Sequence, residues 1–493
     1  MQLLNKVFPS FDEAVADITD GACIGIESWG HPATAQNLVA TVKRKGVKDI
    51  TIVTHNFIPL LAFSEEEVVT PTALLPQMKR LITAVVGLQH LGAGAFVREY
   101  VEKGLEVELT THGTLASRLY AGAARLGGFY DPVGVGTILE GGKDRRVIDG
   151  KEYIFQEPIT LDYAFIRGYK ADKLGNLVYQ GTYRADQPVM AMSAKVTIAE
   201  VDEIVEVGGI DPEHVVTPGI FVNRIVEIPK GGLGTPQKLK ELIYRLGEID
   251  IARRMLFRQM GTDRSYDVVE ARKTKGGLDR ETVAMRAAKE LRDGDCVNLG
   301  LGIPQLCSLY IPEGVIFQSQ NGALGYGPLV LEDEIEQAEW HNIAAGRFFT
   351  PMPGMALFDL LTSFAMIRSS RLITILGGLQ VSEKGDLANW NVADDPLSGT
   401  IGGGMDLALG AKRVIITMEH TNKDGKPKIV RKCTYPLTAK ECVDLIITDL
   451  AVIEVKPEGL VLREVAPRWT AEEVQALTEP NLIIAPDLRE IEL

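Results

Sequence analysis

The sequence predicts an α/β protein with two related open α/β domains in one chain. Short apolar runs rich in β-branched residues alternate with helical patterns, which is typical of βαβ units and a largely parallel sheet. Three local similarities recur in the same order in the two halves of the chain. The length of 493 residues and the 45% share of apolar residues allow more than one packed core.

Four apolar runs are predicted to form buried strands: Ile50–Thr54, Val196–Ala199, Leu372–Leu376 and Val414–Met418. The clearest predicted helix is Arg280–Leu291, because its apolar residues fall on one face at helical spacing. This helix leads directly into a further strand-like run, Cys296–Leu299.

The internal similarities predict the division into domains. The matching pairs are Asp20–Ile26 with Asp293–Leu299, Lys173–Leu177 with Lys384–Leu387, and Ala194–Glu200 with Ala411–Glu419. We predict one domain over residues 1–228 and a second over 278–493. The connector, residues 229–277, is rich in glycine and charge. It is predicted to contain an amphipathic helix docked on a domain, from four apolar residues at helical spacing: Leu239, Leu242, Ile243 and Leu246.

Charge and cysteine usage limit the partners and the compartment. With 52 basic and 66 acidic side chains the formal charge is −14, which argues against nucleic acid and against an anionic membrane as partners. The five cysteines include no C-x-x-C pair, so neither a disulfide framework nor a metal site is expected. The N-terminus lacks a signal pattern, and polar residues interrupt the most apolar stretch, Leu81–Val97. A cytoplasmic protein is therefore expected.

Two glycine-rich clusters are candidate sites. Gly322, Gly325 and Gly327 lie within Gln318–Pro328, which follows the strand-like run Gly314–Phe317. They would let the backbone turn sharply and approach a ligand. Gly402, Gly403 and Gly404 would offer adjacent backbone N–H groups to a developing oxyanion. From spacing alone, a tight structural turn explains the first cluster equally well, and glycine triplets like the second also occur as plain loops.

Several second-half motifs resemble the second half of class I CoA-transferases, most closely the 3-oxoacid and acetate CoA-transferases, with the two subunits fused here. The motifs are Val297–Pro304, Gln318–Gly322 with Gly325–Pro328, Gln380–Trp390, Gly402–Leu407 and Thr417–His420. The first half agrees more loosely, through Glu108–Leu115, Phe129–Thr137, Lys170–Leu177 and Thr217–Phe221.

The resemblance implies two CoA-transferase domains, subunit-A-like and subunit-B-like, with the active site between them. In this family a glutamate attacks an acyl-CoA thioester, forms an acyl anhydride, and becomes a glutamyl-CoA thioester that a free carboxylate then attacks. The resemblance implies acyl-CoA and a small carboxylate as partners, coenzyme A as part of the substrate with no permanently bound cofactor, and a homo-oligomer. Residues expected to bind CoA or the acyl group are Asn321, Gly322, Gly325, Gly327 and Lys384.

Three departures from the family pattern leave the activity open. Gln320 occupies the position of the nucleophilic glutamate, and a neutral amide cannot form the anhydride. Ile26–Gly30 replaces a glycine-rich loop, and His112 replaces a glutamine. If Gln320 is an engineered replacement of Glu, the native protein is a working transferase and this chain an inactivated variant.

If the chain has diverged naturally, Glu27 and His112 could be acid–base groups of an acyl-CoA hydrolase or a carbon–carbon bond-cleaving enzyme. Equally, Glu27 could be a solvated loop carboxylate, and His112 a hydrogen-bonded spacer at a turn. A catalytically silent acyl-CoA binding protein is the third alternative.

Overall fold

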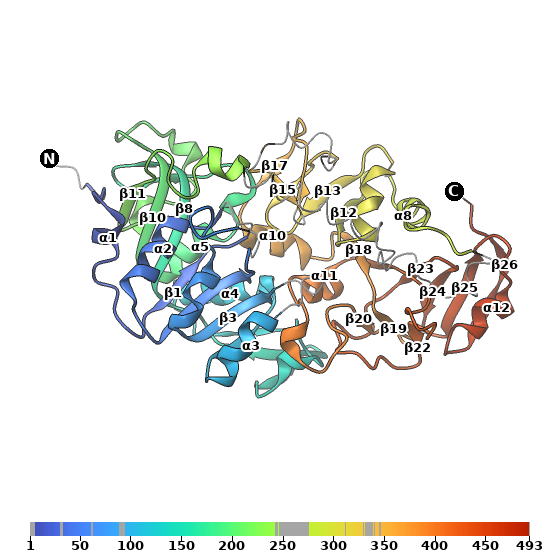
Figure 1. Ribbon diagram of the computed structural model, residues 1–493. Coiled ribbons are helices and arrows are strands. Elements are labelled where there is room, and N and C mark those ends of the chain that lie inside the picture. Colours follow the sequence, from blue (N-terminus) through green and yellow to red (C-terminus); the bar gives the residue numbers. More distant parts are fainter. Residues whose placement is uncertain are drawn as a thin grey trace.

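The two halves of the chain each form their own sheet, and the two sheets lie beside each other. The computed structural model describes residues 5–29, 33–60, 63–87, 94–241, 245, 276–310, 312–328, 330, 339, 341–344 and 347–492. In Figure 1 the first half, blue to green, lies beside the second half, yellow to red. Helices α4 (His112–Ala123), α10 (Leu360–Ile367) and α11 (Gly404–Gly410) meet where the halves join.

The main sheet of the first half has eight strands, and its main path is parallel throughout. Its order along that path is β11 (Arg224–Glu227), β10 (Ala194–Val205), β8 (Leu161–Asp172), β1 (Cys23–Ile26), β2 (Ile50–Phe57), β3 (Met78–Val86) and β4 (Glu106–Leu109). β9 (Leu177–Val178) pairs with β8 away from this path. Helices cover the faces of a parallel sheet, which explains the nearly continuous apolar runs of its central strands.

The main sheet of the second half has ten strands and a parallel centre. Its order is β17 (Ala356–Leu357), β14 (Ala323–Leu324), β13 (Ile316–Ser319), β12 (Cys296–Leu299), β18 (Ile373–Gly377), β21 (Arg413–Met418), β23 (Leu445–Thr448), β24 (Ala451–Lys456), β25 (Gly459–Val465) and β26 (Leu482–Glu490). The five strands from β13 to β23 run parallel, and β14, β17 and β24 join by antiparallel pairing.

The strand orders confirm that the two domains are related. The run β10-β8-β1-β2 of the first sheet corresponds to β21-β18-β12-β13 of the second. The similar segments Asp20–Ile26 and Asp293–Leu299 lead into β1 and β12, which hold equivalent places in these runs. The four predicted strands are confirmed in β2, β10, β18 and β21, except that Leu372 directly precedes β18.

The predicted helix at the start of the second domain is confirmed as α8, although it is shorter than expected. It spans Arg280–Ala288, and the Asp279 side chain caps it by accepting the Thr282 N–H at 2.7 Å. Leu291 lies beyond the last helical residue but is only 3% exposed, so its side chain still belongs to the core.

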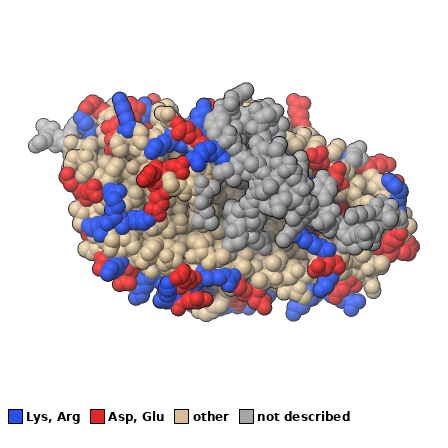
Figure 2. Space-filling view, in the orientation of Figure 1, with Lys and Arg blue, Asp and Glu red and all other residues tan. Residues whose placement is uncertain are grey.

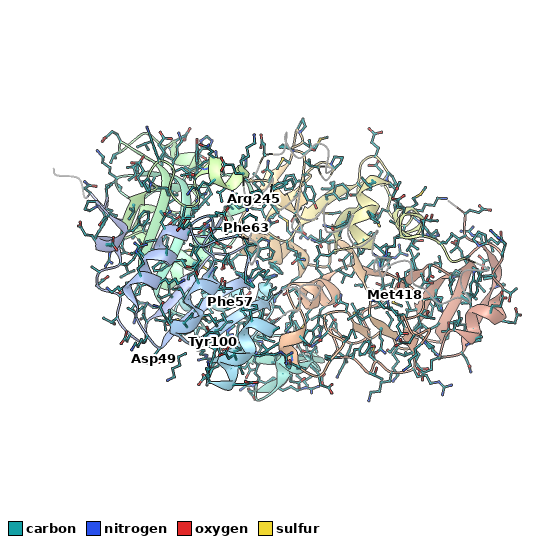
Figure 3. All side chains as sticks on the ribbon, in the orientation of Figure 1. Asp49, Phe57, Phe63, Tyr100, Arg245 and Met418 are labelled. Atoms are coloured by element: carbon teal, nitrogen blue, oxygen red, sulfur yellow. The ribbon has the colours of Figure 1, made fainter. Side chains whose placement is uncertain are left out.

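Part of the predicted connector helix lies among the described residues. Residues 236–241 are helical, and Leu239 is 1% exposed. Arg245 lies over the Phe63 ring, 4.8 Å from its centroid, and pairs with Glu67 (Figure 3). Leu242, Ile243 and Leu246 lie outside the described residues.

The two halves make direct hydrogen bonds and ion pairs with each other. The Leu360 N–H donates to the Ala185 carbonyl at 2.8 Å. Arg368 lies 2.6 Å from Asp406 of its own half and 3.2 Å from Asp131 of the other. Gly113 lets α4 approach closely, because a Cβ there would lie 2.3 Å from Asp406 Oδ1 and 2.5 Å from a ring carbon of Phe364.

Candidate active site

His112 links the two halves at the first residue of α4. Thr111 caps the helix by accepting the Thr114 N–H at 3.1 Å, which holds His112 at the helix start. The backbone N–H of His112 donates to the Gly402 carbonyl of the other half at 3.0 Å. Its ring lies against Trp29, with centroids 4.1 Å apart, and the residue is only 5% exposed.

A second histidine and an aspartate continue inward from His112. The Nδ1 atoms of His112 and His55 lie 2.9 Å apart, and His55 Nε2 lies 2.8 Å from Asp186 Oδ2. His55 lies on β2, and Asp186 directly precedes α5 (Gln187–Ser193). His55 and Asp186 are fully buried, and Asp186 Oδ1 has no partner among the described residues. The three side chains form a continuous row that ends at the contact with the second half.

Glu27 is buried behind this row, which contradicts the alternative of a solvated loop carboxylate. The residue follows β1 where the sheet is covered, so its side chain turns inward rather than to water. Its Oε1 accepts the Trp29 N–H at 2.5 Å, and its Oε2 accepts the Asp186 N–H at 2.9 Å. Both carboxyl oxygens therefore hold the backbone that carries Trp29 and Asp186.

The buried charges shift one another's proton affinities. Burial, followed by the charge of Asp186, raises the pKa of Glu27 to about 7. Burial disfavours the His55 cation, but the charge and hydrogen bond of Asp186 outweigh it, and the pKa of His55 is raised. Burial and then the charge of His55 hold the pKa of His112 well below its ordinary value. Positive charge in the cluster is therefore favoured on His55 and disfavoured on His112.

Gln320 faces this cluster from the second half. It follows β13, and its backbone carbonyl accepts the Ser363 hydroxyl at 2.6 Å. A Cβ added at Gly403 would lie 2.1 Å from Gln320 Oε1, and one at Gly402 would lie 3.6 Å from His112 Nε2. Gln320 and His112 therefore both lie beside the turn formed by Gly402 and Gly403: Gln320 next to Gly403, and His112 next to Gly402. Gly402 has a φ of +58°, which favours glycine at this turn.

The three adjacent glycines, Gly402 to Gly404, differ in whether their backbone N–H already donates a hydrogen bond. The Gly402 N–H donates to the Ala84 carbonyl at 3.0 Å, and the Gly404 N–H donates to the Ile401 carbonyl at 3.4 Å. The Gly403 N–H donates to no residue in the described part of the chain. Of the three candidates, Gly403 thus offers the backbone donor that is still available beside Gln320.

The remaining candidates support the loop that carries Gln320, or lie outside it. The Asn321 amide accepts the Ser319 hydroxyl at 2.5 Å and donates to the Ile343 carbonyl at 2.7 Å. The predicted loop glycines bring this segment against the chain around residues 350–358: Gly322, Gly325 and Gly327. Lys384 is exposed in the turn between β19 (Gln380–Ser382) and β20 (Leu387–Ala388), and the structure does not place it with the other candidates.

Sequence reasoning missed His55 and Asp186. The available signal was a polar residue continuing a buried apolar run, since His55 directly follows the predicted strand Ile50–Thr54. Asp186 gave no comparable signal, because its role depends on a contact between segments 131 residues apart.

The comparison with known families identifies the group to which this fold and site belong. The family model described as Coenzyme A transferase matches residues 8–228 and 280–477. The chain belongs to the coenzyme A transferase family. Mouse mitochondrial succinyl-CoA:3-ketoacid coenzyme A transferase 2A is 35% identical over 97% of this chain and 89% of that protein. Human mitochondrial succinyl-CoA:3-ketoacid coenzyme A transferase 2 is 36% identical over 99% of this chain and 92% of that protein.

Two further comparisons support the fused architecture and the fold of this coenzyme A transferase. The acetate CoA-transferase subunit beta of Escherichia coli K12 is 43% identical over 42% of this chain and 95% of that subunit. One chain here thus includes what that protein has as a separate subunit. An acyl-CoA transferase apoenzyme from E. coli O157:H7 has a TM-score of 0.72 and 19% identity over 99% of this chain and 95% of that one. The predicted fold class and enzyme family are confirmed.

The predicted cytoplasmic location is contradicted by four relatives that match nearly the whole chain and are each named mitochondrial. Net charge and unpaired cysteines are properties of the folded protein, and they are compatible with more than one reducing compartment. These features therefore could not distinguish the cytoplasm from the mitochondrion.

The surface and the cysteines give limited further information about partners. Figure 2 shows Lys and Arg interspersed with Asp and Glu on the face in view. Among the described residues no helix is long and apolar enough to cross a membrane. Within the same residues, no group of three or more His, Cys, Asp or Glu could hold a metal ion.

Proposed function

We propose that this coenzyme A transferase acts on an acyl-CoA thioester whose reacting carbonyl lies between Gln320, Gly403 and His112. The observation that carries the proposal is the meeting of the family's nucleophile position with the unused Gly403 N–H and with His112 at one turn. A backbone N–H in a buried site can stabilise the oxyanion that develops when a thioester is attacked. Asn321 and the glycines of the Gln320 loop support this arrangement from the second half.

Position 320 decides whether coenzyme A can be transferred through a covalent intermediate. A glutamate there could attack the thioester and carry CoA to a small free carboxylate, as the names of the succinyl-CoA:3-ketoacid and acetate CoA-transferase relatives suggest. Gln320 has no ionised oxygen, so we propose that the chain as written forms no glutamyl-CoA thioester. The nearly isosteric change Gln320→Glu would supply the nucleophile, and coenzyme A would enter only as part of the substrate.

Intact-mass spectrometry after incubation with acetyl-CoA or succinyl-CoA tests this proposal. The unchanged chain should show no CoA-sized adduct, and Gln320→Glu should show one that acetate or succinate removes. Gln237→Glu makes the same chemical change at an exposed position and should show no adduct. An adduct on the unchanged chain would overturn the assignment of position 320.

A substitution at Gly403 tests the oxyanion donor in the Gln320→Glu background. Gly403→Val would place its side chain against position 320 and obstruct the N–H. Losing one such donor costs about 2.7–4 kcal/mol of transition-state stabilisation, so transfer should slow by about 10²–10³-fold in a folded protein. Undiminished transfer would place the oxyanion site elsewhere.

The second candidate function is an acyl-CoA reaction that needs no nucleophile at position 320, either thioester hydrolysis or carbon–carbon bond cleavage. The row of His112, His55 and Asp186 favours it, because a buried imidazole beside the turn could act as an acid or base. Free-thiol release by the unchanged chain would distinguish it from a silent acyl-CoA binding protein, which would bind acyl-CoA and release no thiol.

We also propose domain limits at residues 1–228 and 278–493 around a connector, and a homo-oligomeric assembly. The sheets support these limits, since strands of the first come from residues 23–227 and those of the second from 296–490. Light scattering after size-exclusion chromatography would test the assembly. A mass of about 54 kDa, that of the single chain at 53.8 kDa, would contradict it.

A further inference from the structure

The transfer proposed above, through a glutamyl-CoA thioester, assigns no step to the row of His112, His55 and Asp186, and this inference therefore rests on the second candidate function. The two close ring contacts, 2.9 Å between Nδ1 atoms and 2.8 Å to Asp186, join three buried titratable groups from separate segments. Burying such groups is costly unless they are paired, so each contact must satisfy a donor and an acceptor.

Counting protons in this row determines the state of His112. One hydrogen lies between the two Nδ1 atoms, because a short contact between ring nitrogens needs one donor and one acceptor. When His55 is neutral and donates its Nε2–H to Asp186, its Nδ1 can only accept. His112 must then donate from Nδ1, which leaves its Nε2 as a bare base toward the turn at Gly402.

When His55 is an imidazolium, the same contact reverses. His55 then donates from both ring nitrogens, and His112 accepts at Nδ1 and carries its own hydrogen on Nε2. The charge state of His55 therefore sets whether the atom that faces the site is a proton acceptor or a proton donor.

We propose that His112 is the general base of a thioester hydrolysis, and that His55 and Asp186 are positioning residues that receive the proton His112 passes inward. A water donates one proton to His112 Nε2 while the His112 Nδ1 proton moves to His55 Nδ1. The water oxygen forms a bond to the thioester carbon, and the carbonyl electron pair moves to the oxygen facing the Gly403 N–H.

The second half of the reaction returns the proton. The carbon–sulfur bond breaks, the thiolate of CoA takes the proton from His112 Nε2, and the His55 Nδ1 proton returns to His112. The products are a free carboxylic acid and CoA thiol, which balance one acyl-CoA and one water. The positive charge stays on His55, where the charge of Asp186 and then that of Glu27 favour it.

The charged and titratable surroundings of His55 come from several elements. Asp186, Glu27 and Asp406 act on it electrostatically, and His112 is its ring partner. Asp406 is paired with Arg368, which also contacts Asp131. The carboxylates directly beside the row therefore raise the pKa of His55, and lowering the pH converts His112 from the basic to the donor form.

Nitrogen-15 NMR of histidine-labelled protein tests the relay without requiring any activity. The His112 Nε2 signal, assigned with His112→Gln, should change from unprotonated to protonated at the same pH at which His55 becomes charged. In His55→Gln this change should vanish. The control is His420, a buried histidine bonded to Thr448 and Thr478, and His420→Gln should leave the change in place. If the protonation of His112 Nε2 does not change when His55 titrates, the relay is overturned.

Kinetics of free-thiol release from acetyl-CoA, butyryl-CoA and acetoacetyl-CoA provide the second test. The rate should fall tenfold for each pH unit below the His55 pKa, and His112→Gln should lower it by about 10²–10⁴-fold. Asp186→Asn should lower the rate and move the acid limb of the pH profile to lower pH, because it removes the charge that stabilises the His55 cation. A lower rate with an unmoved limb would indicate a purely structural role and overturn the relay.

The same measurements separate failure of the relay from failure of the proposed function. If calorimetry detects acetyl-CoA binding and Gln320→Glu forms the CoA adduct, but the unchanged chain releases no thiol, the relay is wrong and the acyl-CoA site stands. If neither protein binds any of the three acyl-CoAs, both proposals fail.

Discussion

The two halves contribute different groups to the candidate site. The second half supplies backbone and an uncharged amide, through Gln320 and the glycine turn with its available Gly403 N–H. The first half supplies the titratable groups, with Glu27, His55 and Asp186 fully buried. The half with the more specific family motifs thus holds the proposed thioester-binding turn and a neutral amide at position 320, while the more divergent half holds the buried titratable groups.

This difference shows why motif similarity and chemical capacity must be judged separately. The glycine turn needs only backbone atoms to offer a hydrogen-bond donor, whichever side chain occupies position 320. Acid–base chemistry depends on burial and neighbouring charge, which arise from contacts across the fold. The following predictions test how far the two halves depend on each other.

The largest expected effect comes from removing the ion pair between the halves. Arg368→Met would leave Asp131 and Asp406, at 1% and 0% side-chain exposure, without their cation. Breaking such a buried pair costs about 3–5 kcal/mol, so the free energy of unfolding measured with urea should fall by that amount. Arg371→Met at an exposed position should change it by less than about 0.5 kcal/mol. Equal effects would show that the halves are not coupled through Arg368.

The pH dependence of stability should reveal the buried acids of the first half. Burial raises the pKa of Glu27 from 4.5 to about 7, so the folded state holds a proton that the unfolded state has lost between these values. Stability should therefore fall as pH rises through this window, by on the order of 3 kcal/mol for this group. Urea denaturation at several pH values should show a flatter profile for Glu27→Gln.

Glu200 provides the matched comparison for Glu27. Burial also raises its pKa to about 7, but its partners are Asn37 and Leu38 rather than the histidine row. Glu200→Gln should flatten the stability profile similarly, while only Glu27→Gln should lower the pKa of His55. If both variants lower the pKa of His55, or if neither does, Glu27 has no special connection to the row.

A smaller effect is expected where α4 enters the second half. Gly113→Ala would put a methyl group against Asp406 and Phe364, and overpacking of this kind costs about 1–3 kcal/mol. Gly127→Ala is the control, because nothing lies within 4 Å of its added Cβ. Calorimetric melting should show a clear decrease for the first variant alone. Unchanged stability in Gly113→Ala would mean that the contact between α4 and the second half can shift enough to hold the added methyl group.

The smallest effect is expected at Lys384, whose exposed side chain lies apart from the other candidates. Lys384→Ala should change the free energy of unfolding by less than about 0.5 kcal/mol. If Lys384 binds the CoA moiety, the KM for acyl-CoA in the Gln320→Glu background should rise while kcat stays unchanged. An unchanged KM would remove Lys384 from the site.

Local patterns in the sequence were enough to predict much of the architecture. The apolar runs of β2, β10, β18 and β21 and the helical spacing of α8 reflect burial of each element against its own neighbours. The repeated segments at β1 and β12 indicated two related domains, because similar local sequences occupy equivalent places in both sheets. That Gln320 replaces the family's nucleophilic glutamate stays a prediction from its motif.

Three-dimensional contacts were needed to define the environment of the site. No spacing in the chain predicts that His55 meets both His112 and Asp186, since these contacts span 57 and 131 residues. Nor does the triplet Gly402–Gly404 reveal that Ala84 and Ile401 occupy two of its donors and leave Gly403 available. Burial and long-range hydrogen bonds set the charge on each histidine and the availability of each N–H, and both depend on how the two halves pack together.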